Sequence, residues 1–178
     1  MNEIVRVLID EAAISGAVKR LGAKISEDYA PCGARTPPIF IGVLKGSFVF
    51  MADLIRALSI PCEVDFLTAK SYGLNSETSG AVQIVKDIDA DVKGRDVIIV
   101  EDILESANTL YRVCEILRGR EPRSLKVCVF LDKDAGRKIP LAADYKCFDV
   151  GGGFVVGYGL DYAEQYRYLP YLAEVNIK

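Results

Sequence analysis

The chain of 178 residues contains no histidine. This absence excludes the Ser-His-Asp triad, the Cys-His dyad and every metal site that depends on an imidazole ligand. Any acid–base chemistry in this protein must therefore use carboxylates, lysines, tyrosines or water.

Other common patterns are also missing. The five cysteines form no C-x-x-C pair, so we expect buried, reduced thiols. No apolar run reaches the length of a membrane span, and the first residues lack the basic start and apolar stretch of a signal peptide. We expect a cytoplasmic protein that makes no contact with a membrane. The cysteines are Cys32, Cys62, Cys114, Cys128 and Cys147.

An excess of basic residues is missing as well. The net charge is −3 and the sequence pI is about 5.1, which argues against nucleic acid as a partner. Hydrophobic residues make up 51% of the chain and charged residues 26%, the balance of a globular protein. At this length we expect a single domain that spans residues 1–178.

The residues that are present alternate between helical and strand patterns. Residues 10–29 carry apolar side chains at three- and four-residue spacing, which predicts a helix that Asp10 could cap. Short apolar runs predict strands, and their alternation with helices predicts an α/β sheet, parallel at its centre. Ligands bind such sheets at the carboxyl ends of the strands. The further expected strands are 39–44, 62–70, 82–88, 96–100, 126–131, 145–150 and 154–156, and the further helices are 48–58 and 108–118.

The segment 97–110, VIIVEDILESANTL, is the strongest candidate site. An apolar strand leads into Glu101 and Asp102, whose carboxylates could accept hydrogen bonds from sugar hydroxyls or approach a divalent cation. A turn rich in hydroxyl and amide groups then precedes a helix, and a helix N-terminus favours an anion. The residues alone leave a second interpretation open, in which the acids are ordinary loop acids and Ser106 caps the helix. Neither a Walker motif nor a G-x-G-x-x-G fingerprint occurs, so a dinucleotide-binding protein is disfavoured.

This segment resembles the ribose-phosphate motif of the type I phosphoribosyltransferases. Other segments, in the right order along the chain, resemble the purine-salvage branch of that family, the hypoxanthine-guanine phosphoribosyltransferases. These segments are residues 41–54, residues 64–66 with 71–73, residues 131–133, and residues 154–162 with Arg167, Leu169 and Pro170.

The resemblance implies a reaction and a fold. Ribose 5-phosphate would pass from phosphoribosyl pyrophosphate to N9 of hypoxanthine or guanine, giving IMP or GMP and pyrophosphate, with Mg²⁺ as the cofactor. The fold would be that of the type I phosphoribosyltransferases, a central, mainly parallel sheet flanked by helices with a small hood. The hood would come from about residues 1–10 and 133–178. A homodimer or homotetramer is also implied.

The resemblance assigns roles by position. Glu105 would be catalytic and handle the proton on purine N7. Glu101 and Asp102 would hold the ribose hydroxyls and, together with Asp161, the metal. The remaining assignments are Ser106, Ala107, Asn108 and Thr109 for the 5-phosphate; Lys45, Gly46 and Arg167 for pyrophosphate; Lys133, Phe154, Val155 and Asp161 for the purine; and Ser71 and Tyr72 for a lid over the reaction.

The chain departs from the family pattern Asp-Thr-Gly, because it has Glu105-Ser106-Ala107 there. The extra methylene of Glu105 moves a carboxylate by about 1.5 Å, and a misplacement of that order can cost about a hundredfold in rate. A left-handed backbone at Ala107 would cost roughly 1–2 kcal/mol. We favour an active purine transferase, because the lysine, hood and lid residues remain. The alternative is a nucleotide-binding regulator with weak or no turnover.

Overall fold

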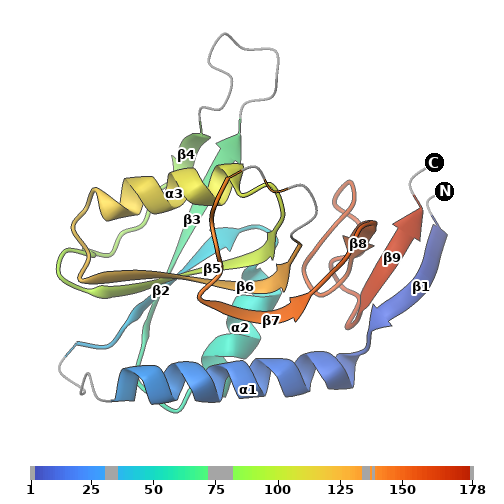
Figure 1. Ribbon diagram of the computed structural model, residues 1–178, viewed down its shortest axis with the longest axis horizontal. Helices are drawn as coiled ribbons and strands as arrows, with labels where there is room; N and C mark the ends of the chain where they lie inside the picture. Colours follow the sequence, from blue (N-terminus) through green and yellow to red (C-terminus); the bar gives the residue numbers. More distant parts are fainter. Residues whose placement is uncertain (1–2, 31–35, 72–81, 134–136, 138, 177–178) are drawn as a thin grey trace, which may run out of the picture.

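The computed structural model describes residues 3–30, 36–71, 82–133, 137 and 139–176 (Figure 1). A six-stranded sheet runs through its centre in the order β4-β3-β2-β5-β6-β7. Every neighbouring pair is parallel except β3 and β4, so the expected α/β sheet with a parallel centre is confirmed. The strands are β2 (Ile39–Leu44), β3 (Glu63–Ser71), β4 (Val82–Lys86), β5 (Asp96–Leu104), β6 (Ser124–Asp132) and β7 (Tyr145–Asp149).

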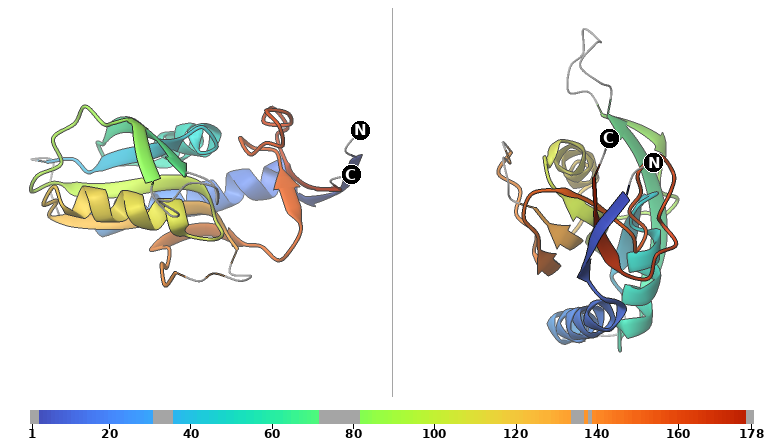
Figure 2. Two further views of the ribbon diagram at one scale, coloured as in Figure 1. Left: turned by 90° about the horizontal axis from the view of Figure 1, so that it is seen from above. Right: turned by 90° about the vertical axis from the view of Figure 1, so that its right-hand side faces the viewer.

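Helices cover both faces of this sheet. Figures 1 and 2 show α1 (Glu11–Tyr29) and α2 (Phe48–Ala57) on one face and α3 (Asn108–Arg118) on the other. Successive strand residues point to opposite faces, so Phe40 packs with α1 and α2, whereas Ile39 and Ile41 pack with α3. Burial on both faces explains why the inner strands β2, β5 and β6 contain continuous apolar runs. No helix in the described part of the chain is long and apolar enough to cross a membrane.

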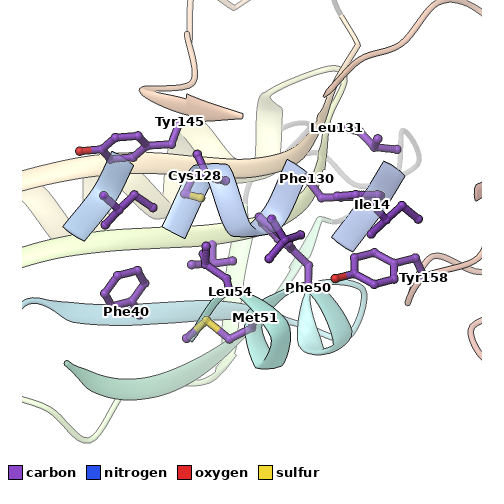
Figure 3. Close-up of a cluster of buried hydrophobic side chains, with 14 of the residues drawn as sticks. Ile14, Phe40, Phe50, Met51, Leu54, Cys128, Phe130, Leu131, Tyr145 and Tyr158 are labelled. Atoms are coloured by element: carbon purple, nitrogen blue, oxygen red, sulfur yellow. The ribbon is translucent and has the colours of Figure 1, made fainter. Parts of the chain in front are cut away.

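The first helix begins where the sequence predicts. The Asp10 carboxylate accepts a hydrogen bond of 2.8 Å from the Ala13 amide, which caps α1. Ile14 and Ile25 point from α1 into the core. Figure 3 shows Ile14 of α1 near Phe50 of α2 and Phe130 of β6. The three side chains belong to one apolar cluster, which packs the two helices against the sheet.

A second, three-stranded antiparallel sheet lies beside the first, in the order β1-β9-β8. Its strands are β1 (Glu3–Ile9), β8 (Phe154–Val156) and β9 (Leu172–Asn176), so the two ends of the chain pair with each other (Figure 1). The sequence pattern did not predict β1 or β9. We call this sheet and the loop 157–171 the hood. β7 falls within the range 133–178 expected for the hood, yet it is an edge strand of the central sheet.

Strand β5 is longer than predicted. It was expected to end at Val100, but Ile103 and Leu104 still pair with β6, so the strand ends at Leu104. Glu101 and Asp102 therefore lie within the strand and not in a loop after it. A regular strand holds the two acids more rigidly than a loop would.

Candidate active site

Glu101 and Asp102 form a pair of carboxyl groups inside the protein. Both residues are partly buried, and their carboxyl groups interact electrostatically with each other. Burial, and then the charge of Asp102, raises the pKa of Glu101 well above its ordinary value. Burial likewise raises the pKa of Asp102. Two acids held this way favour a bound proton or cation between them.

The turn between β2 and α2 lies against this acid pair. The backbone of Gly46 passes so close that an added Cβ would lie 1.6 Å from Asp102 Oδ2, so glycine is required. The peptide bond between Leu44 and Lys45 is cis. The buried Ser47 hydroxyl donates to the carbonyl of Val43 at 2.6 Å, which closes the turn. The predicted pyrophosphate turn and the predicted ribose acids are thus neighbours.

The segment from Glu105 to Thr109, which we call the phosphate loop, leads from β5 into α3. Helix α3 begins at Asn108, as predicted, and its N-cap is Ala107, with no side-chain cap. The interpretation of Ser106 as the helix cap is therefore wrong, and Ser106 is exposed. Ala107 is left-handed, with φ of 65°. No side chain caps the first amides of α3, and Ser106 and Thr109 place hydroxyl groups beside them in the sequence, which suits an anion.

Lys133, at the end of β6, joins the phosphate loop to the hood. Its side chain is buried; its ammonium donates to the carbonyl of Gly153 at 2.9 Å and forms an ion pair with Glu105 at 2.7 Å. These contacts use two of the three donors of an ammonium group. The ring of Phe154 is 41% exposed and lies edge-on to Tyr162 at 5.4 Å. The Lys133 ammonium could donate to an oxygen on a flat ring, and the exposed face of Phe154 could stack on that ring.

The hood loop brings a cluster of charges to the pyrophosphate turn. Arg167 donates to the carbonyl of Gly159 at 2.7 Å and pairs with Asp161 at 2.7 Å and with Glu164 at 3.2 Å. Glu164 also pairs with Lys45 at 2.8 Å, and Lys45 and then Arg167 lower the pKa of Glu164. The predicted pyrophosphate residues Lys45 and Arg167 thus meet on one carboxylate.

Sequence reasoning missed two residues of this region, Glu164 and Arg137. Glu164 lies three residues before Arg167, and this charge spacing was the available signal. Arg137 lies four residues after Lys133 and contacts the carbonyl of Glu105. No motif marked either residue, because both act through contacts between distant segments.

Some expected residues are not brought together. No three acidic or cysteine side chains in the described ranges gather to hold one metal ion. The expected set of Glu101, Asp102 and Asp161 is therefore not formed, because the Asp161 oxygens accept from Arg167 and from the Glu164 amide at 2.8 Å. Of the two lid residues, Ser71 ends β3, and Tyr72 lies outside the described residues.

Comparisons with known proteins show the family of this chain. Residues 8–163 match the phosphoribosyl transferase domain family. The chain is 47% identical to a hypoxanthine phosphoribosyltransferase of Salmonella typhimurium, over 98% of this chain and 97% of the relative. It is also 47% identical to a hypoxanthine-guanine phosphoribosyltransferase of Bacillus subtilis, over 96% and 93%.

A solved structure shows the same fold. The crystal structure of a hypoxanthine-guanine phosphoribosyltransferase of Bacillus anthracis superposes with a TM-score of 0.90 and 41% identity, over 99% of this chain and all of that one. The type I phosphoribosyltransferase fold expected from the sequence is thereby confirmed. By sequence and by structure, the chain belongs to the phosphoribosyl transferase domain family.

Proposed function

We propose that this protein is a purine-salvage phosphoribosyltransferase that converts hypoxanthine or guanine and phosphoribosyl pyrophosphate into IMP or GMP and pyrophosphate. The observation that carries the proposal is the contact between the phosphate loop and Lys133. Glu105 begins that loop and reaches the Lys133 ammonium at 2.7 Å. A ribose phosphate in the loop and a purine on Lys133 would therefore lie next to each other, as a transfer between them requires.

The bound base would be read and activated by two side chains. The remaining Lys133 donor would bond the purine 6-oxygen, and because an exocyclic amine at that position offers no good acceptor, adenine would be disfavoured. As N9 bonds to C1 of the ribose, the bond from C1 to pyrophosphate breaks and the N7 proton passes to Glu105. Phe154 would stack on the base and the Val155 backbone would bond its edge.

The sugar and the leaving group would be held by the opposite half of the site. The acid pair Glu101 and Asp102 would accept hydrogen bonds from the ribose hydroxyls. Amides and hydroxyls of residues 106–109 would cradle the 5-phosphate at the start of α3. Lys45, the Gly46 backbone and Arg167 would contact pyrophosphate, whose oxygens suit the fork of donors on a guanidinium. Ser71 and Tyr72 would close over the reaction.

Mg²⁺ is the cofactor we propose. Burial raises the pKa of both Glu101 and Asp102, and a cation would relieve that cost of holding two carboxylates together. Mg²⁺ prefers one or two carboxylates together with substrate oxygens over a cage of protein ligands, which fits an acid pair beside a bound diphosphate. When bound, it would neutralise charge on the leaving pyrophosphate.

The proposal is tested by incubating the protein with phosphoribosyl pyrophosphate, Mg²⁺ and each purine in turn, and following nucleotide formation by absorbance. We expect product from hypoxanthine and guanine and little from adenine. No nucleotide from any 6-oxopurine at high protein concentration would refute the proposal. Lys133→Ala should lose selectivity between 6-oxo and 6-amino purines by about tenfold or more. Unchanged ratios of kcat/KM across purines would contradict the role of Lys133.

We propose cytoplasmic location and a homodimer or homotetramer. Cys62, Cys114, Cys128 and Cys147 are free thiols, which suits a reducing compartment. A cavity of about 870 Å³ opens between α1, α2 and the hood. Phe48 and Tyr168 line it and are 45% and 83% exposed, as expected of a face that another subunit covers. Light scattering on the purified protein would show its subunit number.

A further inference from the structure

Arg137 is buried behind the phosphate loop and is used by none of the steps above. Its side chain is 10% exposed, and it forms an ion pair with Asp132, whose side chain is 11% exposed. Lys146 also reaches Asp132, at 3.2 Å. A guanidinium is seldom buried unless its donors are occupied, so its contacts indicate what it holds in place.

Most of these contacts are with backbone carbonyl groups. Arg137 Nη2 donates to the carbonyl of Leu104 at 3.1 Å, and Nε makes a longer contact of 3.4 Å with the carbonyl of Glu105. On the other side, Nη1 donates to the carbonyl of Leu141 at 2.9 Å. With the Asp132 contact, four of the five guanidinium donors are used. Two of the four hold the carbonyls where the phosphate loop begins.

Peptide geometry turns these contacts into a constraint on the amides. In a trans peptide, the carbonyl oxygen of one residue and the amide hydrogen of the next point in opposite directions from the same plane. Arg137 holds the oxygens of Leu104 and Glu105, so the N–H groups of Glu105 and Ser106 must point away from Arg137. In the proposed function, the sugar phosphate would bind on the side of the loop opposite Arg137, where these amides could donate to it.

We propose that Arg137 is a positioning residue, which aims the first amides of the phosphate loop at the sugar phosphate. The same residue ties that loop to Asp132, the neighbour of Lys133, so one side chain holds the phosphate subsite and the base subsite in register. Lysine could not replace it, because a single ammonium cannot span carbonyls and a carboxylate as a planar fork does. This inference rests on the proposed function, since it assigns the loop to a sugar phosphate.

The test compares two ligands of the same site. Affinities for ribose 5-phosphate, and for pyrophosphate with Mg²⁺, are measured by calorimetry on the unmodified protein, Arg137→Met and Arg137→Lys. We expect both variants to bind ribose 5-phosphate about tenfold more weakly and pyrophosphate within twofold of the original, because pyrophosphate is held by the 44–47 turn and the hood. The control is Arg112→Met, which removes an exposed charge from α3 and should change neither affinity.

Three outcomes would overturn the inference: equal weakening of both ligands, full restoration by lysine, or unchanged ribose 5-phosphate binding. If Arg137→Met does not fold, Arg137→Lys carries the comparison, with the same loss of about tenfold expected for ribose 5-phosphate alone. If the unmodified protein binds no ribose 5-phosphate, the proposed function itself fails. If it binds and the variants match it, only the role of Arg137 fails.

Discussion

Ala107 has a backbone conformation that costs an alanine free energy. Its φ of 65° is left-handed, where a Cβ is too close to the backbone and where glycine is unstrained. The residue is also buried at the start of α3. The geometry of the phosphate loop is therefore maintained by its surroundings and not by the local preference of the chain.

Ala107→Gly is expected to stabilise the protein. The substitution removes the cost of the left-handed backbone, roughly 1–2 kcal/mol. The greater freedom of glycine in the unfolded chain offsets roughly 0.5–1 kcal/mol of this gain. The net gain of about 1 kcal/mol should raise Tm by about 2–4 °C in thermal unfolding. Ala52→Gly, at an exposed helical position in α2, is the control and should lower Tm. A lower Tm for both variants would show that Ala107 is unstrained.

The side chain of Glu105 is long enough to reach the ammonium of Lys133. The ion pair at 2.7 Å connects the loop with a lysine that is also anchored on Gly153. An aspartate would end about 1.5 Å short at the same backbone position. The glutamate that departs from the family pattern at position 105 is therefore held by an ion pair with Lys133.

Glu105→Asp is expected to lower kcat by about ten- to hundredfold, because a catalytic carboxylate moved by more than an ångström loses its alignment. Steady-state kinetics with hypoxanthine would measure it, with Glu115→Asp, at an exposed position on α3, as the control. A higher kcat would mean instead that the glutamate impairs the present loop.

At the scale of elements, the hood and the turn between β2 and α2 are joined by charge. Glu164 bridges Lys45 and Arg167, one from each element. A Cβ on Gly159 would lie 2.5 Å from the carbonyl of Gly46, so the two backbones also touch. In the free protein, the Glu164 carboxylate therefore lies where its two cations would contact pyrophosphate.

Glu164→Gln is expected to tighten the binding of pyrophosphate about threefold, because a neutral side chain competes less for the exposed Lys45 and the partly buried Arg167. The inhibition constant of pyrophosphate, measured at low salt, would report the change, and added salt should reduce it. Glu121→Gln breaks an exposed ion pair with Lys93 and is the matched control. Weaker inhibition by pyrophosphate would show that Glu164 helps to bind it.

At the scale of the whole molecule, buried carboxyl groups affect stability in opposite directions with pH. The Arg123 hydrogen bond lowers the pKa of Asp96, despite burial, so its contribution is present above the unfolded pKa of about 3.9 and is lost on acidification. Glu101 has a raised pKa instead. Its contribution is complete below about pH 4.3 and is lost as pH rises through the folded pKa.

Glu101→Gln should therefore be more stable than the original protein at pH 8, with Tm higher by a few degrees, because glutamine carries no buried charge. The difference should shrink as the pH is lowered through the raised pKa of Glu101, because the carboxyl group then takes up a proton. Thermal unfolding across that range would measure it, beside the exposed control Glu27→Gln. A constant difference at every pH would contradict a raised pKa.

Local pattern was enough for much of the fold. Helix α1 with its Asp10 cap, strand β2 and helix α3 were predicted nearly to the residue, because periodicity and capping are local properties. The predicted end of β5 at Val100 was wrong, because pairing with β6 extends the strand through Glu101 and Asp102 to Leu104. β1 and β9 were missed, because each is stabilised by a partner at the other end of the chain.

The sequence by itself determined the α/β class, the absence of histidine chemistry and the order of the family motifs, since each follows from residue identity and spacing. The tertiary structure decided which side chains meet. It paired Glu105 with Lys133 and Glu164 with Lys45 and Arg167, and it placed Arg137 behind the phosphate loop. These contacts join residues from separate elements, and only the packing of the sheet, its helices and the hood sets their distances.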